Sequence, residues 1–211
     1  MAGIEHGTGD AARALRTGVT LALVTRRDPE AATQALSARA TRTGSRVLTT
    51  VLVTDVVDST GHAVALGDGR WLRLLERHEA MVRTQIRRAG GHAVAAVGDG
   101  MVARFDGAAI AIRCARRIAR LSRSFGLEVR CGLHCGEYER RGARIGGIVF
   151  HVAERVVHLA APGEVLVSET LKHLAAGSRL HFRARGRRTL RGLRGLWPIY
   201  GVVADEGYVA R

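Results

Sequence analysis

Two aspartates have the residue type and the placement needed to bind a metal ion. Asp55 stands at the end of the apolar, β-branched run RVLTTVLVTDVV, which predicts a buried central strand, and Asp99 lies in a tight Gly-Asp-Gly turn. If the two segments are neighbours, both carboxylates meet at one sheet edge, where they suit Mg²⁺ or Mn²⁺ bridged to phosphates. The backbone over 56–60 turns into a helix and could offer N–H groups to a polyphosphate. Taken alone, each aspartate is more often a turn or capping residue.

The elements that must position these residues follow in a regular order. Apolar side chains at helical spacing predict helices over 68–89 and 107–124. The other predicted elements are two short strands in GGHAVAAVGDGMVARF, a strand in LEVRCGLHCGEYE, a helix in IGGIVFHVAERVVHLA, a strand in APGEVLVS, a short helix near 169–175, and strands LHFRARG, RRTL and LWPIYGVV. This order predicts an α+β fold: a ferredoxin-like (palm-type) antiparallel sheet with helices packed on one face.

Length and charge limit the classes of function. The 211 residues predict a lead (1–45, weakly helical or flexible), one main domain (46–204) and a short tail (205–211). The net charge of +14, with arginine supplying 32 of the 33 basic residues, attracts polyanions such as nucleotides, nucleic acid or acidic lipid. The sequence has no apolar run long enough for a membrane span and no secretory signal. Its three cysteines are too few for a disulfide scaffold, so the cytoplasm is the expected location.

Six stretches together resemble the catalytic domain of class III adenylate/guanylate cyclases, particularly the actinobacterial members. In the family's order and spacing they cover residues 46–203: VLVTDVVDSTGHAVALGDGRW, GDGMVARFDG, GLEVRCGLHCGEYE, GGIVFHVAERV, PGEVLVS and RGLRGLWPIYGV. The resemblance implies a class III nucleotidyl cyclase fold that converts a purine nucleoside triphosphate (ATP by family default) to the 3′,5′-cyclic monophosphate and pyrophosphate. It also implies a head-to-tail homodimer with shared sites, the alternative being a heterodimer with another cyclase chain.

The resemblance assigns a metal and phosphate half of the site. Asp55 and Asp99 match the two aspartates that bind a pair of divalent cations, Mg²⁺ or Mn²⁺, with the Val56 carbonyl as a further ligand. The triphosphate would lie against the backbone that follows, at Val57, Asp58, Ser59 and Thr60.

The second half of the site falls near the C-terminus. Arg155 matches the family's transition-state arginine, and His151 stands where many members have the asparagine that orients the ribose. Arg191 replaces a lysine that grips the triphosphate, and its guanidinium keeps the charge and can fork onto a phosphate.

Two positions depart from the family in the base pocket. Ala95 stands at a base-selecting lysine and Arg144 at a base-selecting aspartate, so the usual means of reading adenine is lost. If Arg144 points inward, its donors match O6 and N7 of guanine and favour GTP over ATP. If it points into solvent, the pocket is weak and non-selective.

The sequence is compatible with three functions. The first is a metal-dependent nucleotidyl cyclase that acts in cyclic-nucleotide signalling. The second is a catalytically degenerate homologue that binds nucleotide or dimerises as a regulatory module. The third is a nucleic-acid-binding protein, which rests on charge alone and is disfavoured by the low aromatic content of 4%.

Other reactive residues have structural interpretations. Cys131 and Cys135 share one side of a strand and His134 the other, which argues against a joint metal site. His78 and His158 fit packed or edge positions in apolar helix stripes. The arginines of 107–124 are interpreted as a solvated face and those of 183–194 as the rim of a triphosphate site, each with nucleic-acid binding as the alternative.

Overall fold

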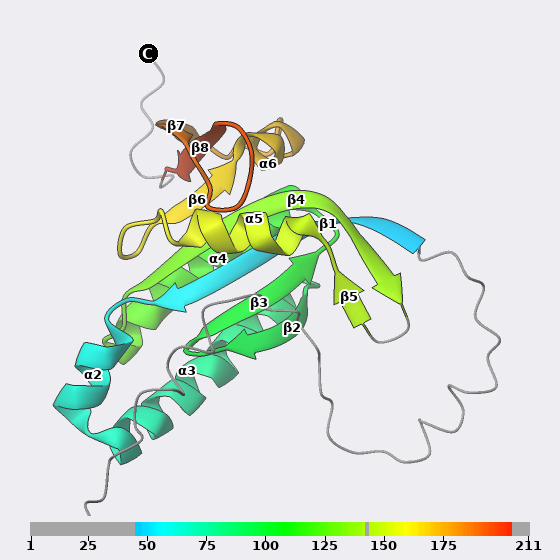
Figure 1. Cartoon of the computed structure of the whole chain (residues 1–211). Coiled ribbons are helices and arrows are strands. Elements are labelled where there is room, and N and C mark those ends of the chain that lie inside the picture. Colours follow the sequence, from blue (N-terminus) through cyan, green and yellow to red (C-terminus); the bar gives the residue numbers. More distant parts are fainter. Residues whose placement is uncertain (1–44, 142–143, 204–211) are drawn as a thin grey trace, which may run out of the picture.

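The computed structural model describes residues 45–141 and 144–203, which form a sheet with helices packed on it (Figure 1). The strands are β1 (Ser45–Val56), β2 (His92–Val97), β3 (Gly100–Phe105), β4 (Val129–Arg141), β5 (Arg144–Gly146), β6 (Val165–Ser168), β7 (Phe182–Arg188) and β8 (Trp197–Val202). The helices are α2 (Ser59–Leu66), α3 (Asp68–Arg88), α4 (Ala108–Ser122), the short 3-10 helix η2 (Arg123–Phe125), α5 (Ile148–Val157) and α6 (Glu169–Leu174). Residues 1–44 and 204–211 lie outside the described part, so the expected lead and tail stay predictions.

Strands β1 and β4 form the centre of the sheet. The strand order is β2-β3-β1-β4-β6-β8-β7, and β5 pairs with β4 off this path. Strands β4 and β6 run parallel, and the other paired strands run antiparallel. Pairing of β1 with β4 extends from Ser45 opposite Arg140 to Val56 opposite Val129. The predicted α+β class with a mainly antiparallel sheet is confirmed.

Helices cover both faces of this sheet (Figure 1). Leu52 belongs to an apolar cluster with α3 and α4, whereas Val51 and Val53 pack with Val149 and Ala153 of α5. Successive strand residues point to opposite faces, so β1 is apolar on both and needs a cover on each. The expectation that the helices pack on one face is therefore wrong for α5.

Three local features differ from the sequence-based expectation. Residues 59–66 form a separate helix, α2, which ends at Gly67 with φ 74° before α3 begins. The short strand β5 was not expected, and RRTL is not a strand of its own, because Arg187 and Arg188 complete β7. Leu190 then turns into an apolar cluster against α5 and β8.

Within residues 45–141 and 144–203, no helix has both the length and the apolar character that a membrane span requires.

Candidate active site

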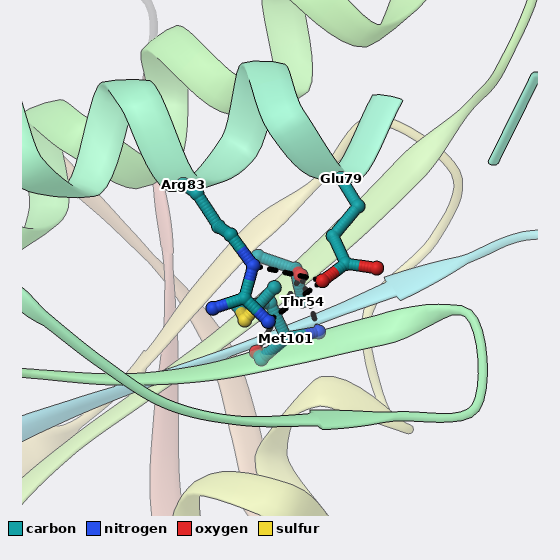
Figure 2. A network of polar contacts seen from close by, with 4 residues as sticks. All are labelled: Thr54, Glu79, Arg83 and Met101. Atoms are coloured by element: carbon teal, nitrogen blue, oxygen red, sulfur yellow. Dashed lines mark hydrogen bonds and ion pairs between the residues drawn. The ribbon is translucent and has the colours of Figure 1, made fainter. Parts of the chain in front are cut away.

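Asp55 and Asp99 come together at one edge of the sheet. Asp55 is the penultimate residue of β1, and the turn that holds Asp99 joins β2 to β3, the neighbour of β1. The Thr54 hydroxyl accepts a hydrogen bond from the Met101 backbone N–H at 3.0 Å, which fixes the turn beside the end of β1 (Figure 2). Gly100 allows this close approach, because a Cβ at that position would lie 2.1 Å from the Thr54 carbonyl oxygen.

The electrostatics of Asp99 show that the two carboxylates interact. Burial raises the pKa of Asp99, a hydrogen bond with the Ser59 side chain opposes the shift, and the charge of Asp55 raises this pKa further. A cavity of about 10 Å³ beside Asp99 is also lined by Glu79 of α3, whose carboxylate pairs with Arg83 at 2.6 Å (Figure 2). Such a site gains from a bound cation, which would relieve the repulsion between the carboxylates.

Arg130 also contacts Asp55, a contact that the sequence analysis did not anticipate. The two residues are direct cross-strand partners in β1 and β4, and the Arg130 Nε and Nη2 lie 2.7 Å and 2.5 Å from the same Asp55 oxygen, Oδ2. Both side chains are largely buried, so the contact orders the Asp55 carboxylate. The available signal was an arginine between the buried residues Val129 and Cys131 at the start of this strand.

The segment after Asp55 provides only part of the expected phosphate cradle. The Val57 N–H donates to the Glu128 carbonyl at 2.9 Å, so it is already used within the fold. Asp58 caps α2 from the left-handed conformation (φ 54°) and accepts from the Gly61 N–H at 3.3 Å. Ser59 bonds Asp99, and Thr60 is exposed at the start of α2.

A second cluster of expected site residues lies on α5. The Arg155 Nη1 is 2.9 Å from the Glu154 carboxylate, and the Arg155 Nε donates to the Arg191 carbonyl at 3.3 Å. The His151 Nδ1 lies 3.8 Å from the same carboxylate. Glu154, which the sequence analysis missed, thus lies between His151 and Arg155, and Arg155 contacts Arg191 directly. Among the described residues, no hydrogen bond or ion pair links this cluster to Asp55 or Asp99.

The two altered base-pocket positions lie on strands that do not pair with each other but pack on one apolar cluster. Ala95 is half-buried in β2, at a register shift against β3, and packs on the apolar cluster of Val51 and Val53. Ile145 of β5 packs on the same cluster, and Arg144 begins that strand. The Arg144 side chain lies outside the described part of the structure, so its direction stays a prediction.

The remaining reactive residues take structural roles. Burial lowers the pKa of His78, whose Nε2 lies 2.8 Å from the Ser122 hydroxyl oxygen, and His158 is exposed at the end of α5. Cys131 and Cys135 face the apolar core on the α4 side, where burial raises the pKa of both thiols. His134 bonds Ser168 instead, at 2.7 Å. The expected placement of the two cysteines and His134 on opposite sides of the strand is confirmed.

Comparisons with known proteins agree with this arrangement. No family model and no curated protein sequence matches the chain. Among solved structures, the adenylyl cyclase CyaB from P. aeruginosa matches with a TM-score of 0.71 and 20% identity, over 80% of this chain and 100% of that one.

Two further solved structures match as well. An adenylate/guanylate cyclase/hydrolase from Silicibacter pomeroyi gives a TM-score of 0.66 and 24% identity, over 77% of this chain and 100% of that chain. The guanylate cyclase domain of RhGC from Catenaria anguillulae was solved in complex with GTP. It gives a TM-score of 0.68 and 16% identity, over 76% of this chain and 98% of that chain. The chain therefore has the fold of the adenylate and guanylate cyclase catalytic domains.

Proposed function

We propose that the protein is a class III nucleotidyl cyclase, which converts a purine nucleoside triphosphate to the 3′,5′-cyclic monophosphate and pyrophosphate. The observation that carries the proposal is the meeting of Asp55 and Asp99 at the end of β1 in a cyclase fold. In the reaction the ribose 3′-oxygen attacks the α-phosphorus and loses its proton. The bond from that phosphorus to the oxygen of the leaving pyrophosphate breaks.

The donor set at this edge fits two divalent cations, Mg²⁺ or Mn²⁺. Asp55, Asp99 and the Val56 carbonyl would hold them, because hard cations prefer oxygen ligands. When bound, such ions supply Lewis acidity at the ribose hydroxyl and neutralise phosphate charge. Arg130 pairs with Asp55, so it orients this carboxylate but adds a positive charge beside the cations.

The α5 cluster supplies the groups for the developing negative charge. Glu154 and the Arg191 carbonyl hold the Arg155 side chain, so less conformational entropy is lost when its guanidinium meets a phosphate. His151 would orient the ribose, and the Arg191 side chain would bind the triphosphate.

The separation of the two clusters supports a shared site in a dimer. Each chain carries the aspartates on one edge and Arg155 on α5 with Arg191 beside it, and no contact between the two sets is described. A head-to-tail homodimer would bring the aspartates of one protomer to the α5 cluster of its partner, and a heterodimer with another cyclase chain would do the same. The proposed location is the cytoplasm, where nucleoside triphosphates are available.

The first prediction tests the acidic pair with purified protein, ATP or GTP, and Mn²⁺ or Mg²⁺. Asp55→Asn and Asp99→Asn should each lower cyclic nucleotide formation by about 100-fold or more, because each removes a charged metal ligand. Asp106→Asn, a change at an exposed aspartate just after β3, is the matched control and should keep the parent rate. Activity near the parent level in either site variant would exclude the two-metal assignment.

A degenerate, nucleotide-binding homologue is the second candidate. Two residues favour this candidate. Ala95 offers no polar group to a purine, and Arg130 forms an ion pair with Asp55, the expected metal ligand. The same assay separates the two: nucleotide binding by calorimetry with no product from ATP or GTP under either metal would support the degenerate form.

A further inference from the structure

A hollow beside α4 has five arginines among its ten lining residues and shares no residue with either cluster of the proposed cyclase site. Its volume is about 660 Å³, which is in the range of small-molecule binding sites. None of its lining residues belongs to the aspartate edge or to the α5 cluster. They are Arg113, Arg116, Arg117, Ala119, Arg120, Arg123, Gly163, Glu164, Val165 and Val202.

The arginines form one stripe because of their spacing. Residues three and four apart share a helix face, so Arg113, Arg116, Arg117 and Arg120 line one side of α4, and Arg123 continues the line in η2. This helix packs on the face of the sheet opposite α5 (Figure 1). The predicted solvated face is confirmed, since Arg113, Arg117 and Arg120 are exposed, and the same arginines line one wall of the hollow.

Several of these guanidinium groups keep their charge uncompensated. Within residues 45–141 and 144–203, Arg117 and Arg120 form no ion pair. Arg113 donates to the Ser178 carbonyl at 2.6 Å, a contact that orients it without neutralising it. Like charges along one helix face repel each other, so the folded chain gains from an anion bound between them.

The acidic lining residue does not oppose an anion. Both Glu164 oxygens are engaged by Arg185 of β7, Oε1 at 2.9 Å and Oε2 at 3.2 Å, and Oε2 also accepts from the Ala161 N–H at 2.9 Å. The negative charge of Glu164 is therefore balanced from outside the hollow.

The facing wall is a tight turn that leaves room for the arginines. Residues 161–164 form a turn with an Ala161 carbonyl to Glu164 N–H bond of 3.0 Å and Gly163 at φ 73°. A Cβ on Gly163 would lie 2.7 Å from the Arg123 Nη2, so the glycine lets this guanidinium sit against the turn while Glu128 pairs with it at 3.3 Å.

We propose that this hollow is a binding site for a short polyphosphate chain, either inorganic or at the 5′ end of a nucleotide. Guanidinium groups match phosphate oxygens in geometry and charge, and several of them converge on one concave space. A polyphosphate concentrates several negative charges in one short chain, which suits a hollow lined by several arginines. The site is separate from the proposed cyclase site and does not depend on cyclase activity.

The test uses the full chain in EDTA, so that metal-bridged binding at the cyclase site does not contribute. Inorganic triphosphate, ATP, AMP and a 20-base-pair DNA duplex are titrated by calorimetry at low and at physiological salt. Two double variants are compared with the parent: Arg117→Gln with Arg120→Gln in the hollow, and Arg87→Gln with Arg88→Gln at the exposed end of α3 as the control of equal charge. Glutamine keeps a helix propensity near that of arginine, so folding is preserved, and circular dichroism checks it.

We expect inorganic triphosphate to bind the parent and the control with equal affinity, and at least tenfold more tightly than AMP does. Its affinity for the hollow variant should be at least tenfold lower than its affinity for the parent. Equal affinity of ATP and triphosphate identifies the phosphate chain as the ligand, whereas tighter ATP binding adds a contribution from the nucleoside. Equal binding by the hollow variant and the control overturns the proposal. Duplex binding that triphosphate does not displace, and that only the hollow variant loses, also overturns it in favour of a nucleic-acid surface.

Discussion

The ion pair between Arg130 and Asp55 places a fixed positive charge at the edge where the cations would bind. Charge-assisted bonds between partly buried groups are stronger than surface ion pairs, and losing one partner leaves a carboxylate poorly solvated. The same arginine repels a divalent cation. Its contributions to fold stability and to metal affinity therefore have opposite signs.

The second prediction follows from these opposite signs. Arg130→Gln should lower the free energy of unfolding by about 1–3 kcal/mol and raise the affinity for Mn²⁺ severalfold, measured by urea denaturation and by Mn²⁺ titration without nucleotide. Arg46→Gln removes an exposed ion pair with Glu137 and should change neither quantity measurably. If Mn²⁺ binds Arg130→Gln no better than the parent, Asp55 is not a metal ligand.

The third prediction concerns His134 and acid. Burial lowers the pKa of His134 to about 4, against 6.5 in the unfolded chain. Between these values the unfolded state binds more protons, so the free energy of unfolding is highest above pH 6.5. It falls toward pH 4, by at most about 1.4 kcal/mol per pH unit. His134→Gln should reduce this slope by about one proton, measured by urea denaturation at pH 7, 6 and 5.

His78 shifts in the same direction and preserves part of the slope in that variant. The exposed His92→Gln serves as the control and should keep the parent slope. A His134→Gln slope equal to that of the parent would show that this imidazole is protonated in the folded state.

At the scale of elements, the position of α5 depends on one glycine of β4. A Cβ on Gly132 would lie 2.2 Å from the Val157 backbone nitrogen and 2.6 Å from the Val157 Cα, so a side chain there must push the helix off the sheet. Gly136 faces the same helix, but its Cβ would stand 3.4 Å from the nearest Val149 atoms. The two glycines thus form a matched pair.

The fourth prediction uses that pair. Gly132→Ala should lower the free energy of unfolding by about 3 kcal/mol, and Gly136→Ala by less than about 1.5 kcal/mol, measured by chemical denaturation. Because α5 carries His151 and Arg155, Gly132→Ala should also lower cyclase activity at temperatures where it stays folded. Equal stability of the two variants would contradict the close packing of α5 on β4.

The sequence predicts a site residue when a local pattern marks it, and misses one when its role depends on tertiary contacts. Asp55 and Asp99 carry local signals, a strand end and a glycine-flanked turn, and the structure brings both together. Arg130 depends on the register between β1 and β4, which no local pattern sets. Glu154 contacts His151 and Arg155 within the same helix, whereas the contact of Arg155 with the Arg191 carbonyl depends on the tertiary fold.

The same reasoning explains the error about the faces of the sheet. A strand apolar on both sides shows that two layers of helix are needed, but not which helix supplies each layer. The glycine pair before α5 marks where the helix begins. Which face of the sheet α5 covers depends instead on its tertiary packing against Val51 and Val53.

At the scale of the whole molecule, the division of the site into two clusters can be tested by mixing. The fifth prediction is that Asp55→Asn and Arg155→Ala are each inactive alone but together regain about a quarter of the parent activity. Random exchange makes half of the dimers mixed, with one intact site of two. Asp55→Asn mixed with Asp99→Asn, both on the same edge, should stay inactive. If the mixture of Asp55→Asn and Arg155→Ala stays inactive although light scattering of tagged chains shows subunit exchange, the shared site is contradicted.

The central pairing of β1 with β4 also sets the order in which a newly made chain can fold. Thr54 meets Met101 across 47 residues, and Asp55 meets Arg130 across 75, so β1 gains its two neighbours long after it leaves the ribosome. Closing such long loops has an entropic cost that local helices do not have, which makes the central ladder slow to form. During synthesis β1 is an unpaired apolar strand of the kind that invites aggregation and chaperone binding. The step that finally buries it is also the step that gives Asp55 its partner, so folding and the assembly of the acidic edge are one event.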